Sequence, residues 1–168
     1  MQTAPRAAGI GSQHGNASQQ LRAGWEPMSD HYLEGRAELL DSIVDHLTQR
    51  LANQSSVVVE LGSGTGTLLA RLAASLPSAR LVGVEIDPVL RRLHQLGPAS
   101  AHGARVHVVD ADLGGSDWTR SIEGPVDVVS AEYHPDHRSL REPFAVAGMA
   151  SVVVEQRLRS SKLIIVGV

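Results

Sequence analysis

The sequence predicts an α/β fold, in which a doubly wound parallel sheet of about five strands lies between two layers of helices. Short β-branched runs alternate with segments of helical periodicity along the 168-residue chain. A glycine-rich loop at residues 62–66 follows directly on one such run and precedes a helical segment. Strands that alternate with helices imply right-handed crossovers and a sheet covered on both faces. The length suits one domain and is too short for two ordinary ones.

Residues 1–28 are expected to form a flexible tail, because they are rich in Gly, Ala, Ser and Gln and contain few large apolar groups. A role of this arm in covering a bound ligand is the alternative. The ordered domain is expected over residues 29–168, and Ser29 and Asp30 suit the start of a long amphipathic helix. The apolar residues of this helix recur at helical spacing and are Leu33, Leu40, Ile43, Val44, Leu47 and Leu51.

The remaining elements follow from changes of period along the chain. Asp87 and Pro88 suit a helix start, with Asp as the cap and Pro at the first helical position. A last helix is expected over 140–158, although the three valines at 152–154 weaken its helical pattern. The expected strands are 57–59, 81–86, 106–109, 126–129 and 163–168, and a further helix is expected over 67–76.

Composition excludes several classes of function. The net charge of −3 provides no basic field for nucleic acid, and aromatic residues make up only 3% of the chain, so nucleic acid is not an expected partner. The absence of cysteine excludes thiol catalysis, disulfides and cysteine-ligated zinc. The chain has neither the apolar segment of a secretory signal nor an apolar run of membrane-spanning length, so we expect no membrane partner and a cytoplasmic protein.

The loop after the first expected strand is the most informative part of the sequence. Glu60 ends the apolar run, and Gly62, Gly64 and Gly66 follow at alternate positions. A loop between a parallel strand and its helix lies at the carboxyl edge of the sheet, where open α/β sheets bind ligands. Glycine lets the backbone adopt positive φ and lets a ligand approach without a Cβ in its path. Three such glycines therefore favour a ligand site over a plain turn or helix cap.

The details of this loop narrow the choice of ligand. Its spacing differs from the dinucleotide pattern G-x-G-x-x-G, and no Lys or Arg lies within it to hold a pyrophosphate, which disfavours a nicotinamide dinucleotide. Glu60 would repel phosphate and attract a cation. Glu85 ends the second expected strand, where a carboxylate can accept two hydrogen bonds from a ribose diol. A ligand with a ribose, a cationic end and no phosphate fits, and S-adenosylmethionine has all three properties.

Two segments carry a specific resemblance to a known family. ELGSGTG and VGVEIDP resemble the first and second motifs of class I S-adenosylmethionine-dependent methyltransferases, which have a Rossmann-like fold. VVDADLGGSDW, residues 108–118, is similar to the segment after the third strand in the same family. The resemblance covers about residues 31–129. It implies a set of cofactor-binding residues, which are Glu60, Gly62, Gly64, Gly66, Glu85, Ile86, Asp112 and Leu113.

The resemblance also implies a role for each part of this set. Glu60 would lie near the ammonium group of the methionine part, with the three glycines under the cofactor. Glu85 would bind the ribose hydroxyls and Ile86 would lie against the adenine. Asp112, followed by Leu113, would contact adenine N6. Asp110 is the competing choice for that contact, and a turn or cap is the alternative for either aspartate. Trp118 would fill the core rather than shield the adenine.

The chain departs from the family at its fourth motif. The segment VDVVSAEYHPDH, residues 126–137, gives no firm match for a family histidine, so the roles of Tyr133, His134 and His137 stay open and no catalytic residue is assigned. His134, Asp136 and His137 form an incomplete ligand set, so no metal site is expected.

The second departure concerns the end of the chain. The family usually continues past the fifth strand with a helix and an antiparallel strand pair, whereas this sequence ends at Val168. The expectation is a C-terminally shortened domain whose fifth strand, LIIVGV, is a bare sheet edge open to self-association. The predicted function is methyl transfer from S-adenosylmethionine to a small-molecule acceptor. The alternative is a non-catalytic, truncated methyltransferase-like subunit that binds the cofactor or a partner protein.

Overall fold

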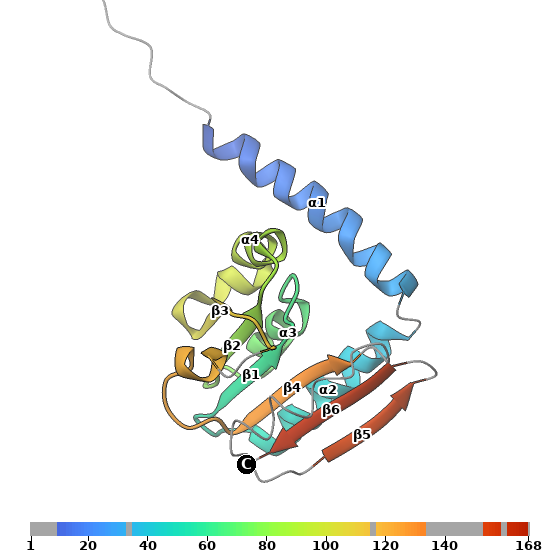
Figure 1. The fold of residues 1–168 in the computed structure, drawn as a ribbon, viewed down its shortest axis with the longest axis vertical. Helices are drawn as coiled ribbons and strands as arrows, with labels where there is room; N and C mark the ends of the chain where they lie inside the picture. Colours follow the sequence, from blue (N-terminus) through green and yellow to red (C-terminus); the bar gives the residue numbers. More distant parts are fainter. Residues whose placement is uncertain (1–9, 33–34, 115–116, 134–152, 159–160, 168) are drawn as a thin grey trace, which may run out of the picture.

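The fold is built around one sheet of six strands (Figure 1). The computed structural model describes residues 10–32, 35–114, 117–133, 153–158 and 161–167. The strand order is β3-β2-β1-β4-β6-β5. The strands are β1 (Val57–Leu61), β2 (Arg80–Glu85), β3 (Val106–Asp110), β4 (Val128–Tyr133), β5 (Val153–Leu158) and β6 (Ser161–Gly167). The first four run parallel, β6 runs antiparallel to β4, and β5 runs antiparallel to β6.

The helices are α1 (Ile10–Tyr32), α2 (Arg36–Leu51), α3 (Thr67–Ser75) and α4 (Pro88–Leu96), with the 3-10 helices η1 (Pro98–Arg105) and η2 (Asp117–Ser121). Of these, α3 and α4 connect strands where the sequence predicts helices. The start of α4 confirms the predicted cap, because the Asp87 carboxylate accepts the N–H groups of Val89 (2.7 Å) and Leu90 (3.0 Å). The four parallel strands coincide with the predicted runs to within two residues at each end, except that β4 ends four residues later than predicted.

Alternation along the parallel strands divides the core between the two faces of the sheet. On one face, Val58, Leu81, Val106 and Val128 pack with the buried leucines of α2 and α3. On the other face lies Trp118 of η2, which is 1% exposed. It packs with a second set of strand residues, which are Val59, Leu61, Val82, Val84, Val129 and Ala131. A parallel sheet with apolar cover on both faces confirms the predicted α/β class, and the position of Trp118 confirms that it belongs to the core.

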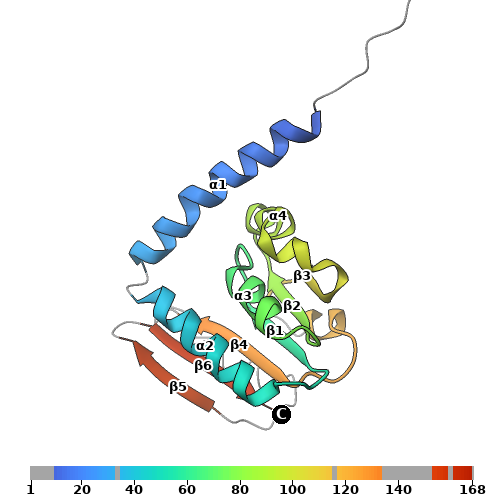
Figure 2. The same cartoon turned by 180° about the vertical axis from the view of Figure 1, so that it is seen from behind.

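The structure differs from the sequence-based expectation at the N-terminus. Residues 10–32 form a helix where a flexible tail was expected up to residue 28, and residues 1–9 lie outside the described part. The helix expected to begin at Ser29 is instead the end of α1 followed by α2, with Gly35 at φ 83° before it. Figures 1 and 2 show the start of α1 reaching beyond the sheet and its covering helices. The boundary of the domain at residue 29 stays a proposal.

Two expectations about the C-terminal part are wrong. Residues 153–158 form strand β5, not the end of a helix, which agrees with the β propensity of their valines. Residues 163–167 of the predicted edge strand LIIVGV belong to β6, which lies between β4 and β5, so this strand is not the bare edge of the described sheet. Only residues 159–160 separate β5 from β6 in the sequence, and so short a connection fits antiparallel neighbours.

A membrane-spanning helix is not found in the part of the chain that the structure describes.

Candidate functional site

The glycine loop leaves β1 at the carboxyl edge of the parallel strands and leads into α3. All three glycines have positive φ, at 69° for Gly62, 54° for Gly64 and 76° for Gly66. The N–H groups of Gly62 and Ser63 donate to the Val84 carbonyl at 2.8 and 3.1 Å. These bonds attach the inner side of the loop to the end of β2.

The three glycines differ in their surroundings. A Cβ added at Gly62 or Gly64 would meet no heavy atom within 4 Å, whereas one at Gly66 would lie 2.8 Å from the His94 ring. Gly66 is therefore required by close packing inside the protein. Gly62 and Gly64 combine a backbone that side chains resist with open space beside it, which is the property of a loop that receives a ligand.

Glu85 holds the centre of the glycine loop. Its side chain is 8% exposed. One carboxylate oxygen, Oε2, accepts the N–H of Gly64 at 2.9 Å, and Oε1 accepts the N–H of Asp87 at 2.9 Å. The next residue, Ile86, is 57% exposed and presents an apolar surface beside this carboxylate along the chain. The structure thus brings together Glu85 and the glycine loop, which are far apart in the sequence.

Glu60 lies at the end of β1, in the middle of the sheet. Its side chain is buried, and its strand neighbours in register are Gly83 on β2 and Ser130 on β4. Because side chains alternate along a strand, Glu60 points to the same face as Val58, the face that α2 and α3 cover. A buried carboxylate next to the glycine loop makes this part of the site attractive to positive charge.

The two aspartates after β3 each have a partner within the protein. Asp110 lies beside Glu85 in the sheet register, and its Oδ1 forms an ion pair with Arg91 at 2.7 Å. Asp112 is exposed, and its Oδ1 accepts the Gly114 N–H at 2.8 Å, as in a turn. Leu113 is partly buried against the core of the second sheet face. The assignment of Asp112 and Leu113 to the adenine stays a prediction.

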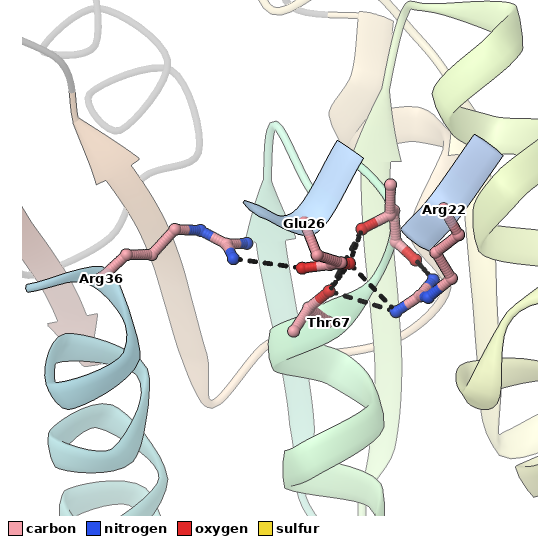
Figure 3. Close-up of polar contacts among 5 residues, drawn as sticks. Arg22, Glu26, Arg36 and Thr67 are labelled. Carbon is pink, nitrogen blue, oxygen red and sulfur yellow. Dashed lines mark hydrogen bonds and ion pairs between the residues drawn. The ribbon is translucent and has the colours of Figure 1, made fainter. Parts of the chain in front are cut away.

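A polar network on the outer side of the loop was missed by sequence reasoning. Figure 3 shows Glu26 of α1 between Arg36 of α2 and Thr67 at the start of α3. The Glu26 Oε1 atom accepts the hydroxyls of Thr65 (2.8 Å) and Thr67 (2.6 Å), and Oε2 lies 3.3 Å from the Arg36 guanidinium. Arg22 donates to the Thr65 carbonyl at 2.7 Å and pairs with Glu26 at 3.3 Å.

The charge of Glu26 is stabilised by these neighbours. Burial alone would raise the pKa of its carboxyl group. Hydrogen bonds from Thr67 and Thr65 and the positive charges of Arg22 and Arg36 outweigh burial, so the pKa of Glu26 lies below its ordinary value. The only sequence signal for this network was an acid four residues after a base, Arg22 and Glu26, which is common on exposed helices.

His94 lies beneath the loop and was also missed. Its ring is 2% exposed and packs against Gly66, and neither ring nitrogen has a hydrogen-bond partner within the described residues. Burial, with the nearby charges of Arg22 and His107, lowers the pKa of His94 to about 4. His94 is therefore a neutral packing residue near pH 7, in contact with the part of the loop that turns into α3.

Several residues that the sequence analysis considered for chemistry lie outside the described part of the structure. His134, Asp136 and His137 are not among the described residues, and of Tyr133 only the backbone, at the end of β4, is described. No group of three or more His, Cys, Asp or Glu side chains converges within residues whose placement is described.

No family profile matches the chain. It is similar to the release factor glutamine methyltransferase of Mycolicibacterium smegmatis (strain ATCC 700084 / mc(2)155), with 30% identity over 89 residues, 53% of this chain and 31% of that enzyme. The match thus spans about a third of the length of that relative.

Solved structures that resemble this chain include methyltransferases. Magnesium protoporphyrin IX methyltransferase from Synechocystis PCC 6803, solved with bound S-adenosylmethionine, aligns with a TM-score of 0.54 at 16% identity over 79% of each chain. A putative rRNA-methylase from Clostridium thermocellum aligns with a TM-score of 0.53 at 13% identity, over 76% of this chain and 94% of that one. At these identities the likeness establishes the fold. The chain has the Rossmann-like fold of class I S-adenosylmethionine-dependent methyltransferases, as the resemblance of its motifs predicts.

Proposed function

We propose that the chain binds S-adenosylmethionine at the glycine loop and transfers its methyl group to an acceptor. The observation that carries this proposal is the open side of the loop. Gly62 and Gly64 have positive φ and empty space where side chains would lie, and the buried carboxylate of Glu85 binds Gly64. Such a backbone allows close approach of a ligand, and a carboxylate at the end of the second strand is an acceptor for ribose hydroxyls.

The residues present fit this cofactor better than a dinucleotide. Residues 62–66 include no Lys or Arg, and Glu60 is buried just before them, so the site suits a cation better than a pyrophosphate. The exposed side chain of Ile86 offers an apolar surface for the adenine ring. We extend the proposal to Asp112 and Leu113 as adenine contacts.

Methyl transfer mainly requires that the acceptor is aligned with the methyl group of the cofactor. The bound cofactor supplies a methyl group on a sulfonium, a good leaving group. The residues of the chain then need to hold acceptor and methyl group in line and, for some acceptors, to remove a proton. Glu60 and Glu85 serve binding in this account, and the catalytic role stays unassigned.

The proposal also concerns the class of molecule that accepts the methyl group. A small molecule is the acceptor that the sequence predicts. The curated relative is named for a glutamine of release factors, and one structural neighbour is described as a putative rRNA-methylase. The expectation that excluded nucleic acid therefore gains no support, and a protein, an RNA and a small molecule all belong among the acceptors tested.

A calorimetric titration tests the proposal. S-adenosylmethionine and S-adenosylhomocysteine should bind the full chain, and NAD should not. Glu85→Ala should weaken binding by about 1–3 kcal/mol, because hydrogen bonds to a charged acceptor are lost. Thermal unfolding without cofactor provides the control for folding. Preferential binding of NAD, or no binding of either methyl compound, would overturn the proposal.

A transfer assay with a labelled methyl group then separates the enzyme from the non-catalytic alternative. The acceptors are a glutamine-containing peptide, an RNA and a mixture of small metabolites. Tight binding of S-adenosylmethionine without transfer to any acceptor would favour the alternative of a cofactor-binding subunit.

A further inference from the structure

The outer side of the glycine loop is attached to the rest of the protein through helix α1. The inner side is bonded to Val84 and Glu85 of β2. On the outer side, the Thr65 carbonyl accepts from Arg22, and the Thr65 hydroxyl donates to Glu26. Both partners come from α1, about forty residues earlier in the chain, so the position of the loop depends on where α1 lies.

Glu26 also completes the start of α3. The N-cap of α3 is Gly66, which provides no side-chain hydrogen bond to the helix. The Glu26 carboxylate accepts the hydroxyl of Thr67, the first residue of α3, at 2.6 Å. A negative charge near a helix N-terminus is favourable because it meets the positive end of the helix dipole. Glu26 thus supplies from another helix the charge that the glycine cap lacks.

Arg22 connects the same loop to α4. Its guanidinium donates to Thr65 and lies so close to Gly97, at the end of α4, that a side chain there would overlap it. The side chain of Arg22 is 16% exposed and that of Glu26 is 26% exposed. The two residues therefore fill a partly desolvated seam between α1, the loop and α4, where charged hydrogen bonds are stronger than at an open surface.

Helix α1 has few other attachments in the described structure. Among the residues of α1 whose burial is described, none belongs to the buried apolar core. Leu21 is 60% exposed and Met28 is 41% exposed. Trp25 is partly buried. The hydrogen bonds and ion pairs of Arg22 and Glu26, in contrast, are concentrated on the loop that the proposed cofactor uses and on Arg36. A helix held in this way can be displaced without unfolding the sheet.

We propose that Arg22 and Glu26 are positioning residues of the cofactor site, which couple the docking of α1 to cofactor binding. This inference rests on the proposed function. The two residues hold Thr65 and Thr67 and so keep Gly62 and Gly64 in the conformation that receives the ligand. Coupling between two sites is reciprocal, so bound cofactor also holds α1 in place.

The test uses the full chain and S-adenosylhomocysteine as the probe. Calorimetry is run on wild type, Glu26→Gln, Thr67→Val and the double variant. Each single variant should lose affinity roughly tenfold, within the usual range of coupling between sites. The double variant should lose less than the product of the two single losses, because Glu26→Gln weakens and Thr67→Val removes the same contact. Gln20→Ala, an exposed position on the same helix, is the matched control and should bind as wild type does.

Hydrogen exchange in residues 20–28 distinguishes positioning from general support. In wild type the probe should slow exchange there, and in Glu26→Gln it should not. Thermal unfolding without probe should show a single cooperative transition for every variant, so that a lost affinity does not reflect an unfolded protein. Equal affinity of wild type and both single variants, or exchange in α1 that ignores the probe, would overturn the inference and leave the proposed function intact. Failure of wild type to bind the probe would instead reject the proposed function itself.

Discussion

At the scale of single residues, two glycines of one loop are required for different reasons. Gly64 leaves open space for a ligand, and Gly66 allows close packing against His94. Gly64→Val should abolish cofactor binding while the protein stays folded, because the branched side chain would enter the open space and resist a φ of 54°. Gly66→Ala should lower the free energy of unfolding by about 1–3 kcal/mol, because its methyl group would meet the His94 ring. Calorimetry and denaturant unfolding measure the two effects. Tight binding by Gly64→Val would show that the open side is not the ligand side.

His94 should make stability depend on pH. Its pKa is lowered from 6.5 to about 4 in the folded protein, so above about pH 6.5 it is neutral in both states and has no effect. As the pH falls from 6.5 towards 4, the unfolded chain binds a proton that the folded one does not, so the free energy of unfolding falls, by roughly 3 kcal/mol in total. Denaturant unfolding at a series of pH values should show a flatter slope for His94→Gln.

An unchanged slope in His94→Gln would contradict this account. Some slope should remain in any case, because burial and the charge of Arg80 also lower the pKa of His107, while Glu123 opposes them. The carboxyl group of Glu26 acts in the same direction at lower pH. Its lowered pKa means that its contribution is present above the ordinary carboxyl pKa and is lost as the pH falls through the folded value.

The parts of the site that sequence could reveal lie in contiguous motifs. Glu60 and the glycines are neighbours in the chain, and Glu85 ends the next strand, so strand order alone brings them to one edge. Arg22 and Glu26 reach the loop across about forty residues. Their contact depends on where a mostly polar helix docks, and no periodicity in the sequence encodes that position.

At the scale of elements, α1 and α2 are held by different forces. Leu47 of α2 is fully buried, and Leu47→Ala should lower the free energy of unfolding by about 2–5 kcal/mol, because it leaves a cavity. Leu21 of α1 is 60% exposed, and Leu21→Ala should change stability by less than about 0.5 kcal/mol. Denaturant unfolding measures both. A large loss in Leu21→Ala would mean that α1 buries more apolar surface than its position shows.

Elements with an apolar signal were predictable, and those without one were not. The runs of valine and leucine in β1 and β2 must be buried, and the sheet buries them. The argument for a flexible tail compared only the apolar surface of residues 1–28 with the entropy of ordering them. Hydrogen bonds and ion pairs at Arg22 and Glu26 lie outside such a comparison. Residues 153–158 were expected to end a helix, and they instead form a strand that pairs with β6, a contact that local periodicity does not encode.

At the scale of the whole molecule, β4 is the strand at which the sheet changes from parallel to antiparallel pairing. Strands β3, β2, β1 and β4 are parallel, and their carboxyl ends present the glycine loop and Glu85 at one edge. Strand β6 reverses direction against β4 and carries β5 on its other side. Because β6 runs antiparallel to β4, the amino end of β6 lies at the edge of the sheet where β4 ends. Ser161 and Lys162 of β6 therefore lie at the same edge of the sheet as the proposed site.

The central position of β6 predicts its hydrogen exchange. In an antiparallel ladder, the N–H groups of successive residues point alternately to the two sides of the strand. Because β6 has β4 on one side and β5 on the other, consecutive amides over residues 162–167 should all exchange slowly. Among the described strands, β3 pairs with β2 alone and is the internal control, in which alternate amides over Val106–Asp110 should exchange faster. Residue-resolved exchange by NMR measures both patterns. Fast exchange at every second residue of 162–167 would place LIIVGV at the sheet edge after all.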